Sequence, residues 1–140
     1  MQEKWTDDMI AEFQAKVEDA KRCVEAMLNL PDPPTALFCT NDTIAVGAIK
    51  AANALQRRIP DDLAIVGFDD SPICSMMEPE ITSVRIDTFS MGEISANMLV
   101  ALMEKKDVPM SSQCIPAQLV VRQTTAARAF PDSPGRRPAP

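Results

Sequence analysis

The sequence predicts an α/β domain: a doubly wound parallel sheet flanked by helices. Two apolar, β-rich runs at residues 34–40 and 63–68 support this prediction, and each ends abruptly in acidic or amide side chains. A continuous apolar run without polar alternation is typical of a strand covered on both faces, as in parallel sheets. A helical pattern separates the two runs, which favours strands joined by right-handed crossovers.

Composition limits the number of domains and the class of function. The chain has 140 residues, 46% hydrophobic and 24% charged, which is enough for one modest domain with a core. Its formal net charge is −6 and its basic residues are scattered, which argues against nucleic-acid binding by this polypeptide alone. No apolar run is long enough to span a bilayer, so no membrane association is predicted.

The cysteines and the absence of histidine restrict the chemistry. The cysteines are far apart and form no C-x-x-C pair, so neither a zinc site nor a redox motif is indicated; they are Cys23, Cys39, Cys74 and Cys114. Reduced thiols and a cytoplasmic location are expected. Because the chain has no histidine, Ser-His and Cys-His catalysis are excluded. We therefore predict no catalytic residue, no metal and no cofactor.

The first third of the chain is predicted to hold a strand, a helix and a second strand. Residues 9–14 are assigned to a short strand. A helix follows, because apolar side chains recur on one stripe, namely Val17, Ala20, Val24, Met27 and Leu28. The prolines at 31–34 end that helix. A strand at 35–40 then leads to Asn41 and Asp42.

The helix predicted at 42–56 is apolar around most of its circumference. Asp42 is expected to cap its start, since a carboxylate can accept from backbone N–H groups of the first turn. A helix that rests on a sheet needs an apolar stripe of only about 100°. A second face is therefore predicted to be buried against a partner chain or a neighbouring lobe. We expect a homodimer through this helix and the loop at 73–77.

The remaining elements are a strand at 63–68, a short strand at 81–86, an amphipathic helix at 89–104 and a strand at 114–122. The order is thus βαβαβ, then a loop, a helix and a final strand. Residues 1–128 are assigned to the domain. Residues 129–140 are Pro-rich with little to bury, and are predicted to be a disordered tail.

Asn41 and Asp69 follow the two strands that define the fold. Ligands in open α/β sheets bind beyond the carboxyl ends of the strands. An amide offers a donor and an acceptor, whereas a carboxylate offers acceptors only. We predict that both residues contact a small-molecule ligand; the plain alternatives are a turn residue and a loop acid. Asp70 is expected to point elsewhere, because neighbours on a strand face opposite sides.

Several motifs together resemble a known family. They are PTALFCTND-x-x-A-x-GA at 34–48, IP-x-D-x-x-IVGFDD at 59–70, P-x-ITSVR at 79–85, Met91-Gly92, and LVVRQTTA at 119–126. In this order and spacing they resemble the C-terminal part of the effector-binding domain of the lactose and galactose repressor (LacI/GalR) family. The resemblance covers roughly residues 9–126.

The resemblance implies a periplasmic-binding-protein-like sensor, in which two lobes close on a sugar or another small metabolite. It implies that Asn41 and Asp69 bond this effector. DNA would be bound only through an N-terminal helix-turn-helix absent from this chain. The helix at 89–104 would cross into the other lobe, so that the chain carries half a pocket. One alternative is a transport or chemosensory sugar-binding protein, but the VVRQTT ending favours the repressor family. Another is an enzyme using Asp42 and Asp69, which the missing histidine disfavours.

Four further residues are placed at the pocket rim: Ala15, Ile86, Thr88 and Met91. Family members often have a stacking aromatic at position 15 and an amide at position 86, so a smaller or more apolar effector than a sugar is left open. For Thr88 and Met91 the plain interpretation is a helix start and a core stripe. Gln56 stands where the family usually has Gly. The helix must therefore end differently there or bear about 1 kcal/mol of strain.

Overall fold

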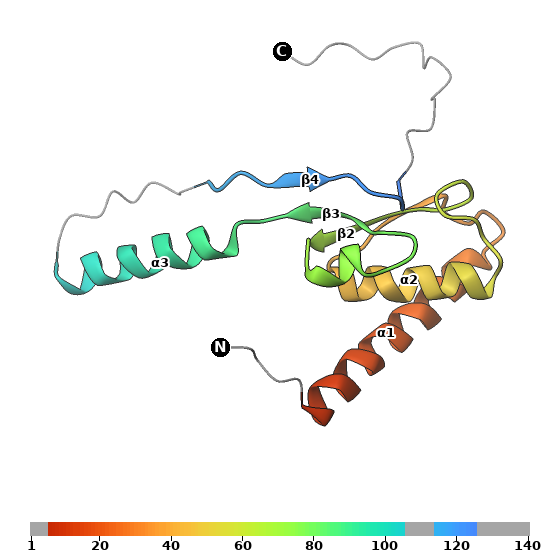
Figure 1. Cartoon of the computed structure of the whole chain (residues 1–140), viewed down its shortest axis with the longest axis horizontal. Helices are drawn as coiled ribbons and strands as arrows, with labels where there is room; N and C mark the ends of the chain where they lie inside the picture. The colour runs from red at the N-terminus through yellow and green to blue at the C-terminus, as the bar shows by residue number, and fades with distance from the viewer. Residues whose placement is uncertain (1–5, 106–113, 126–140) are drawn as a thin grey trace, which may run out of the picture.

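The computed structural model describes residues 6–105 and 114–125 (Figure 1). Its elements are α1 (Asp7–Leu28), β1 (Ala36–Phe38), α2 (Asp42–Ala54), β2 (Ala64–Asp69), the 3₁₀ helix η1 (Pro72–Ser75), β3 (Thr82–Arg85), α3 (Thr88–Met103) and β4 (Gln118–Val120). The sheet order is β1-β2-β3-β4, with β1 to β3 parallel and β4 antiparallel to β3. The predicted α/β class, with a mainly parallel sheet and flanking helices, is confirmed. The predicted tail at 129–140 lies outside the described residues.

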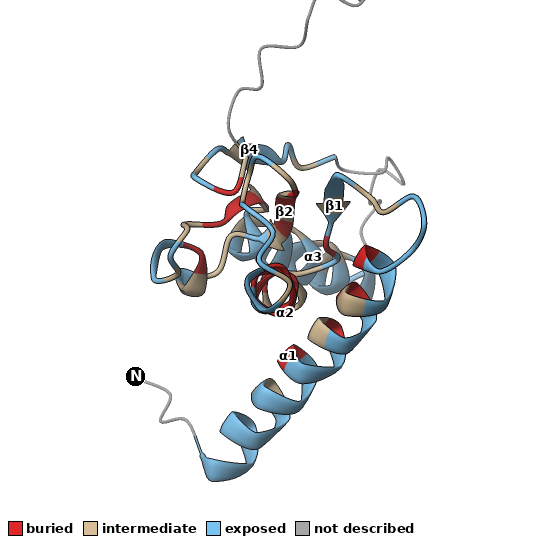
Figure 2. Ribbon diagram, turned by 90° about the vertical axis from the view of Figure 1, so that its right-hand side faces the viewer, coloured by how far each residue is buried: buried red, intermediate tan, exposed pale blue. Residues whose placement is uncertain are grey.

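The sheet, α2 and α1 form successive layers (Figures 1 and 2). α2 packs against β2, and α1 packs across α2. The core between the sheet and α2 contains Ile49, Leu63, Ile65 and Ile81, each at most 1% exposed. α1 adds Val17, Val24 and Leu28 to the same cluster. Removal of these side chains from water is the main term that stabilises the arrangement.

α2 is apolar around most of its circumference because two layers of the same chain bury it. Val46, at the centre of the helix, is only 4% exposed. The prediction that a partner chain or another lobe covers its second face is wrong, since α1 covers it. A homodimer stays a prediction. Of the two elements predicted to form it, the loop at 73–77 still exposes Met76, at 78%.

α1 begins at Asp7, so the strand predicted at residues 9–14 is wrong. Thr6 Oγ1 accepts a hydrogen bond from the Met9 N–H at 3.3 Å and caps the helix. Asp7 and Asp8 lie in the first turn, where the helix dipole favours negative charge. These signals outweigh the short apolar run that suggested a strand. The described chain therefore starts with a helix in place of the predicted first β-strand.

The sheet face opposite α2 remains open in the described part of the chain. Phe38 and Leu119 are 65% and 54% exposed, and Phe38 makes an edge contact with Phe68, with ring centroids 6.4 Å apart. Parallel sheets normally have both faces covered. The described residues thus supply one of the two helical layers that a doubly wound sheet needs.

α3 extends away from the sheet and contains no buried residue (Figure 1). Phe89 and Met103, near its two ends, are 81% and 75% exposed. The predicted apolar helix at 89–104 is present, and within the described residues no element packs closely against it. Neither α3 nor any other described helix is long and apolar enough to cross a membrane.

The segment after β4 ties the amino ends of β2 and β3 together. Thr124 is fully buried; its Oγ1 donates to the Ile65 carbonyl at 2.7 Å and accepts from the Thr82 N–H at 2.8 Å. The Thr124 carbonyl also accepts from the Ile65 N–H at 3.0 Å. A polar side chain is tolerated in this core position because its hydrogen-bonding groups are satisfied.

α2 ends with Gln56 in the left-handed conformation, at φ 53°. The Arg57 N–H donates to the Ala52 carbonyl at 2.8 Å and the Gln56 N–H to the Asn53 carbonyl at 3.1 Å, which is the hydrogen-bond pattern of a Schellman motif. Glycine usually takes this position because it lacks a Cβ. Of the two outcomes predicted from the sequence, a different helix end or a strained one, the structure has the second.

Gly47→Ala tests the close crossing of α1 and α2. A Cβ at position 47 would lie 2.6 Å from both the Ala20 Cβ and the Val17 carbonyl oxygen, so the helices would have to separate. We expect the free energy of unfolding, measured by urea denaturation, to fall by about 2 kcal/mol. Gly92→Ala is the matched control, because it adds the same methyl to a helix with nothing within 4 Å. Equal losses in the two variants would contradict the tight crossing.

Gln56→Gly should relieve the strain at the end of α2. We expect the free energy of unfolding to rise by about 0.5–1 kcal/mol, because glycine adopts the left-handed conformation without a Cβ clash. Gln56→Ala retains the Cβ and serves as the control, with no gain expected. Thermal and urea denaturation of the three proteins would measure the difference. The assignment of strain fails if the Gly variant is no more stable than the Ala variant.

Candidate functional site

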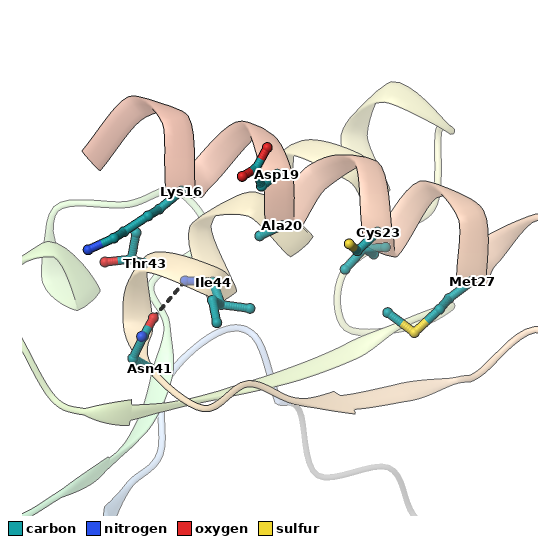
Figure 3. A pocket seen from close by; sticks show the side chains of 9 residues that line it. Lys16, Asp19, Ala20, Cys23, Met27, Asn41, Thr43 and Ile44 are labelled. Atoms are coloured by element: carbon teal, nitrogen blue, oxygen red, sulfur yellow. Dashed lines mark hydrogen bonds between the residues drawn. The ribbon is translucent and has the colours of Figure 1, made fainter. Parts of the chain in front are cut away.

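A groove of about 470 Å³ lies between α1 and the beginning of α2 (Figure 3). This volume is within the range of small-molecule sites. The groove is lined by Lys16, Asp19, Ala20, Cys23, Val24, Met27, Asn41, Thr43 and Ile44. Of the two predicted ligand contacts, Asn41 lines the groove and Asp69 does not.

Asn41 is the N-cap of α2. Its backbone is extended and its Oδ1 accepts a hydrogen bond from the Ile44 N–H at 3.0 Å (Figure 3). The prediction that Asp42 caps this helix is therefore wrong. The residue before the first helical one has the extended backbone that directs a side chain at the first-turn amides. The cap occupies Asn41 Oδ1 and leaves the Nδ2 amide as a donor for a ligand.

The charged side chains of the groove have partners along α1. Lys16 Nζ lies 2.6 Å from Glu12 Oε1, and Asp19 pairs with Arg22. These pairs are exposed and contribute little to stability. Because their charges are already paired, the groove mainly offers an apolar surface, with neutral polar groups at its α2 end.

β2 ends in a strained turn. Asp69 and Asp70 have φ values of 96° and 52°, in the left-handed region that favours glycine. Residues in such conformations cost about 1–3 kcal/mol each and persist only where the surroundings fix them, often at ligand sites. The two carboxylates diverge: Asp69 is exposed, whereas the Asp70 side chain is 3% exposed.

Asp70 anchors this turn to β3 and to the segment after β4. Its Oδ2 accepts from Arg85 Nε at 2.6 Å, and Arg122 Nη1 lies 2.7 Å from its Oδ1. The Asp70 N–H donates to Ser83 Oγ at 3.1 Å. Burial raises the pKa of the Asp70 carboxyl, but the guanidinium groups of Arg122 and Arg85 outweigh burial and hold that pKa below its ordinary value.

Asn41 and Asp69 lie at the same edge of the sheet. β1 and β2 pair in parallel with Phe38 opposite Val66, and Asn41 and Asp69 each come three residues after this pair. Neighbouring strands are about 4.8 Å apart. The sheet therefore delivers both residues to one edge, although the groove includes only Asn41. Their joint contact with a ligand stays a prediction.

None of the four predicted rim residues lines this groove. Ala15 is exposed on α1, and Met91 is 44% exposed on α3. Ile86 and Thr88 line a second cavity of about 400 Å³, formed by the β3–α3 connection together with Pro116 and Gln118. The described residues thus distribute the predicted site over two cavities and open surface, and its assembly into one pocket stays a prediction.

Three polar residues that fix the turn after β2 were not predicted: Ser71, Ser83 and Arg122. Ser83 carries a signal that could have been used, because a serine inside an apolar strand requires a hydrogen-bond partner. Arg122 carries no such signal. Its partner, Asp70, is 52 residues away in the sequence, and no local pattern connects them.

The sequence matches the family model described as a periplasmic binding protein-like domain over residues 2–125. The chain belongs to the periplasmic binding protein-like domain family. It is 34% identical over 125 residues to the ribose operon repressor of Halalkalibacterium halodurans. That match covers 89% of this chain but 38% of the repressor, so the chain spans well under half the length of this relative.

Solved structures agree with this membership of the periplasmic binding protein-like family. A LacI-family regulatory protein from Chloroflexus aggregans is 31% identical with a TM-score of 0.70, covering 79% of this chain and 40% of that one. A LacI-family regulator from Arthrobacter sp. FB24, solved in complex with lactose, is 26% identical with a TM-score of 0.68, covering 79% and 41%. The resemblance to the LacI/GalR family is confirmed.

The Asp70 cluster predicts a defined loss of stability in acid. A carboxyl whose pKa is lowered by folding stabilises the protein above its ordinary pKa, and this contribution disappears as the pH falls through the folded value. Asp70→Asn should therefore reduce the free energy of unfolding more at pH 7 than at pH 3. Urea denaturation across this range measures both. The same loss at the two pH values would contradict the ion-paired state of Asp70.

Proposed function

We propose that this chain is the ligand-sensing lobe of a bacterial LacI-family transcriptional regulator. In this proposal it binds a sugar or another small metabolite and modulates DNA binding by a helix-turn-helix outside the chain. The family match over residues 2–125 and the repressor relatives support a regulator's ligand-binding domain. The relatives favour this function over a transport protein of the same architecture.

The observation that carries the proposal is the placement of Asn41 and Asp69 at one edge of the sheet. Asn41 comes three residues after the end of β1 and Asp69 is the last residue of β2, and these two strands are parallel neighbours. Ligands of open α/β sheets bind beyond this edge. Asp69 is exposed and held in a left-handed conformation, which fits a residue whose position is fixed for binding.

The hydrogen bonds already made narrow the chemistry of the ligand. Asn41 Oδ1 caps α2, so Nδ2 remains to donate to the ligand. Asp69 can only accept when ionised. A ligand that contacts both Asn41 and Asp69 must therefore carry an acceptor and a donor close together. Two neighbouring hydroxyl groups provide this pair. The complex of the Arthrobacter relative with lactose is consistent with a hydroxyl-rich effector.

A second lobe would complete the site in this proposal. α3 has no buried residue in the described chain, and the sheet face opposite α2 exposes Phe38. We place α3 against the other lobe and a further layer of the parent protein on that sheet face. An effector that contacts both lobes then shifts their arrangement by its difference in affinity for the open and closed states.

The test is ligand binding by the full-length regulator to which we assign this chain. Isothermal titration with D-ribose, lactose and adenosine covers a pentose, a disaccharide and a more apolar hydroxyl-bearing ligand. We expect at least one of them to bind and to change the affinity for operator DNA. Binding of none of the three probes, in a folded protein, would contradict the proposed ligand class.

Asn41→Asp separates ligand binding from helix capping. Aspartate caps as well as asparagine, so the free energy of unfolding should stay within about 0.5 kcal/mol of wild type. The lost Nδ2 donor should weaken effector binding by about tenfold or more. Asp69→Asn should weaken it similarly, and Asp61→Asn in the remote connector is the control. An unchanged dissociation constant in both site variants would refute their assigned contacts.

A further inference from the structure

Asp42 is a carboxylate buried where α2, β3 and the turn after β2 meet. The residue is 2% exposed. Its Oδ2 accepts from the Ser71 N–H at 2.7 Å and from Ser71 Oγ at 2.9 Å, and its Oδ1 accepts from Ser83 Oγ at 2.7 Å. These partners in the described chain are neutral donors. One side chain thereby links three segments that lie far apart in the sequence.

The surroundings leave the carboxylate little room to move. A Cβ at Gly67 would lie 2.3 Å from Asp42 Oδ1, so β2 needs glycine where it passes this side chain. The fully buried thiol of Cys74 is also a neighbour. Burial raises the pKa of Cys74 to about 12, with a further contribution from a hydrogen bond to Asp42. The thiol therefore stays neutral beside the carboxylate.

Asp42 and its partners lie near the predicted ligand residues in the sequence or through one further hydrogen bond. Asn41 precedes it directly and caps the helix that Asp42 begins. Ser71 comes two residues after Asp69, and Ser83 also accepts from the Asp70 N–H. The Asp42 side chain thus joins the start of α2 to the strained turn through its hydrogen bonds with Ser71.

We propose that Asp42 is a positioning residue that sets the spacing between Asn41 and Asp69 and so controls effector affinity. The proposal rests on the proposed function for the identity of the ligand site. A buried carboxylate is costly unless its acceptors are satisfied, and here the same hydrogen bonds satisfy it and tie the turn after β2 and strand β3 to the start of α2. Asp42 itself does not contact the ligand; it acts through its two neighbours.

Asp42→Ala is the principal test, with Asp62→Ala as the matched control. Asp62 also accepts three hydrogen bonds, all from Arg58 in the connector before β2. In the 140-residue chain, Asp42→Ala should speed hydrogen exchange of the Ser71 and Ile44 amides by about tenfold. In the full-length regulator it should raise the dissociation constant for the probe that binds (D-ribose, lactose or adenosine) by about tenfold. Asp62→Ala should change neither.

Asp42→Asn provides a conservative rescue. Its Oδ1 can still accept from the Ser71 N–H while its Nδ2 donates to the Ser83 hydroxyl, so affinity should return to within about threefold of wild type. A purely structural role would lower stability in Asp42→Ala and leave the dissociation constant of the folded fraction unchanged. That result would overturn the proposal.

A milder pair of variants decides the question if Asp42→Ala does not fold. Ser71→Ala removes one hydroxyl bonded to Asp42, and Ser75→Ala removes a hydroxyl of η1 that donates to the Pro72 carbonyl. We expect Ser71→Ala to weaken probe binding by about threefold and Ser75→Ala to leave it unchanged. Equal dissociation constants overturn the role of Asp42. Absence of probe binding by the wild type instead overturns the proposed function, and the claim about affinity with it.

Discussion

The turn after β2 has a backbone conformation that is unusual for two consecutive residues other than glycine. Two consecutive non-glycine residues, Asp69 and Asp70, lie in the left-handed region. Hydrogen bonds and ion pairs from three other segments offset the cost of this backbone conformation. They come from β3 through Ser83, from the segment after β4 through Arg122, and from α2 through Asp42. The carboxyl edge of the sheet is therefore held by one connected set of polar contacts, which includes Asp70 and Ser71, the two residues directly after Asp69.

Much of the fold could be predicted because local patterns and tertiary packing agree. The two long apolar runs with polar ends are strands, and α2 and α3 begin within a residue of their predicted starts. The wrong predictions arise where two local signals favoured different structures or where the sequence could not identify a packing partner. Residues 9–14 form a weak apolar run that suggested a strand. The Thr6 cap just before them favours a helix, and the segment is helical. For α2 the pattern correctly indicated two buried faces but could not identify α1 as the second cover.

The candidate site was predictable in position but not in its internal contacts. Strand ends can be read from the sequence, so Asn41 and Asp69 could be placed at one edge of the sheet. Which of Asn41 and Asp42 caps α2 depends on a backbone angle at the first helical residue, and adjacent residues with similar capping tendency give no sequence signal for it. The contacts of Asp42 with Ser71 and Ser83 span 29 and 41 residues, beyond the reach of any local pattern.

The open form of the site bears on the proposed sensor function. Small-molecule sites usually bury most of their ligand, whereas the described groove is bounded by α1 and α2 only, and Asp69 lies outside it. In the proposed function, one lobe alone then holds a ligand only weakly. If the second lobe closes over the edge that carries Asn41 and Asp69, most of the binding energy arises on closure. That energy is the difference in affinity between open and closed states, which is the quantity that can drive a change in DNA binding.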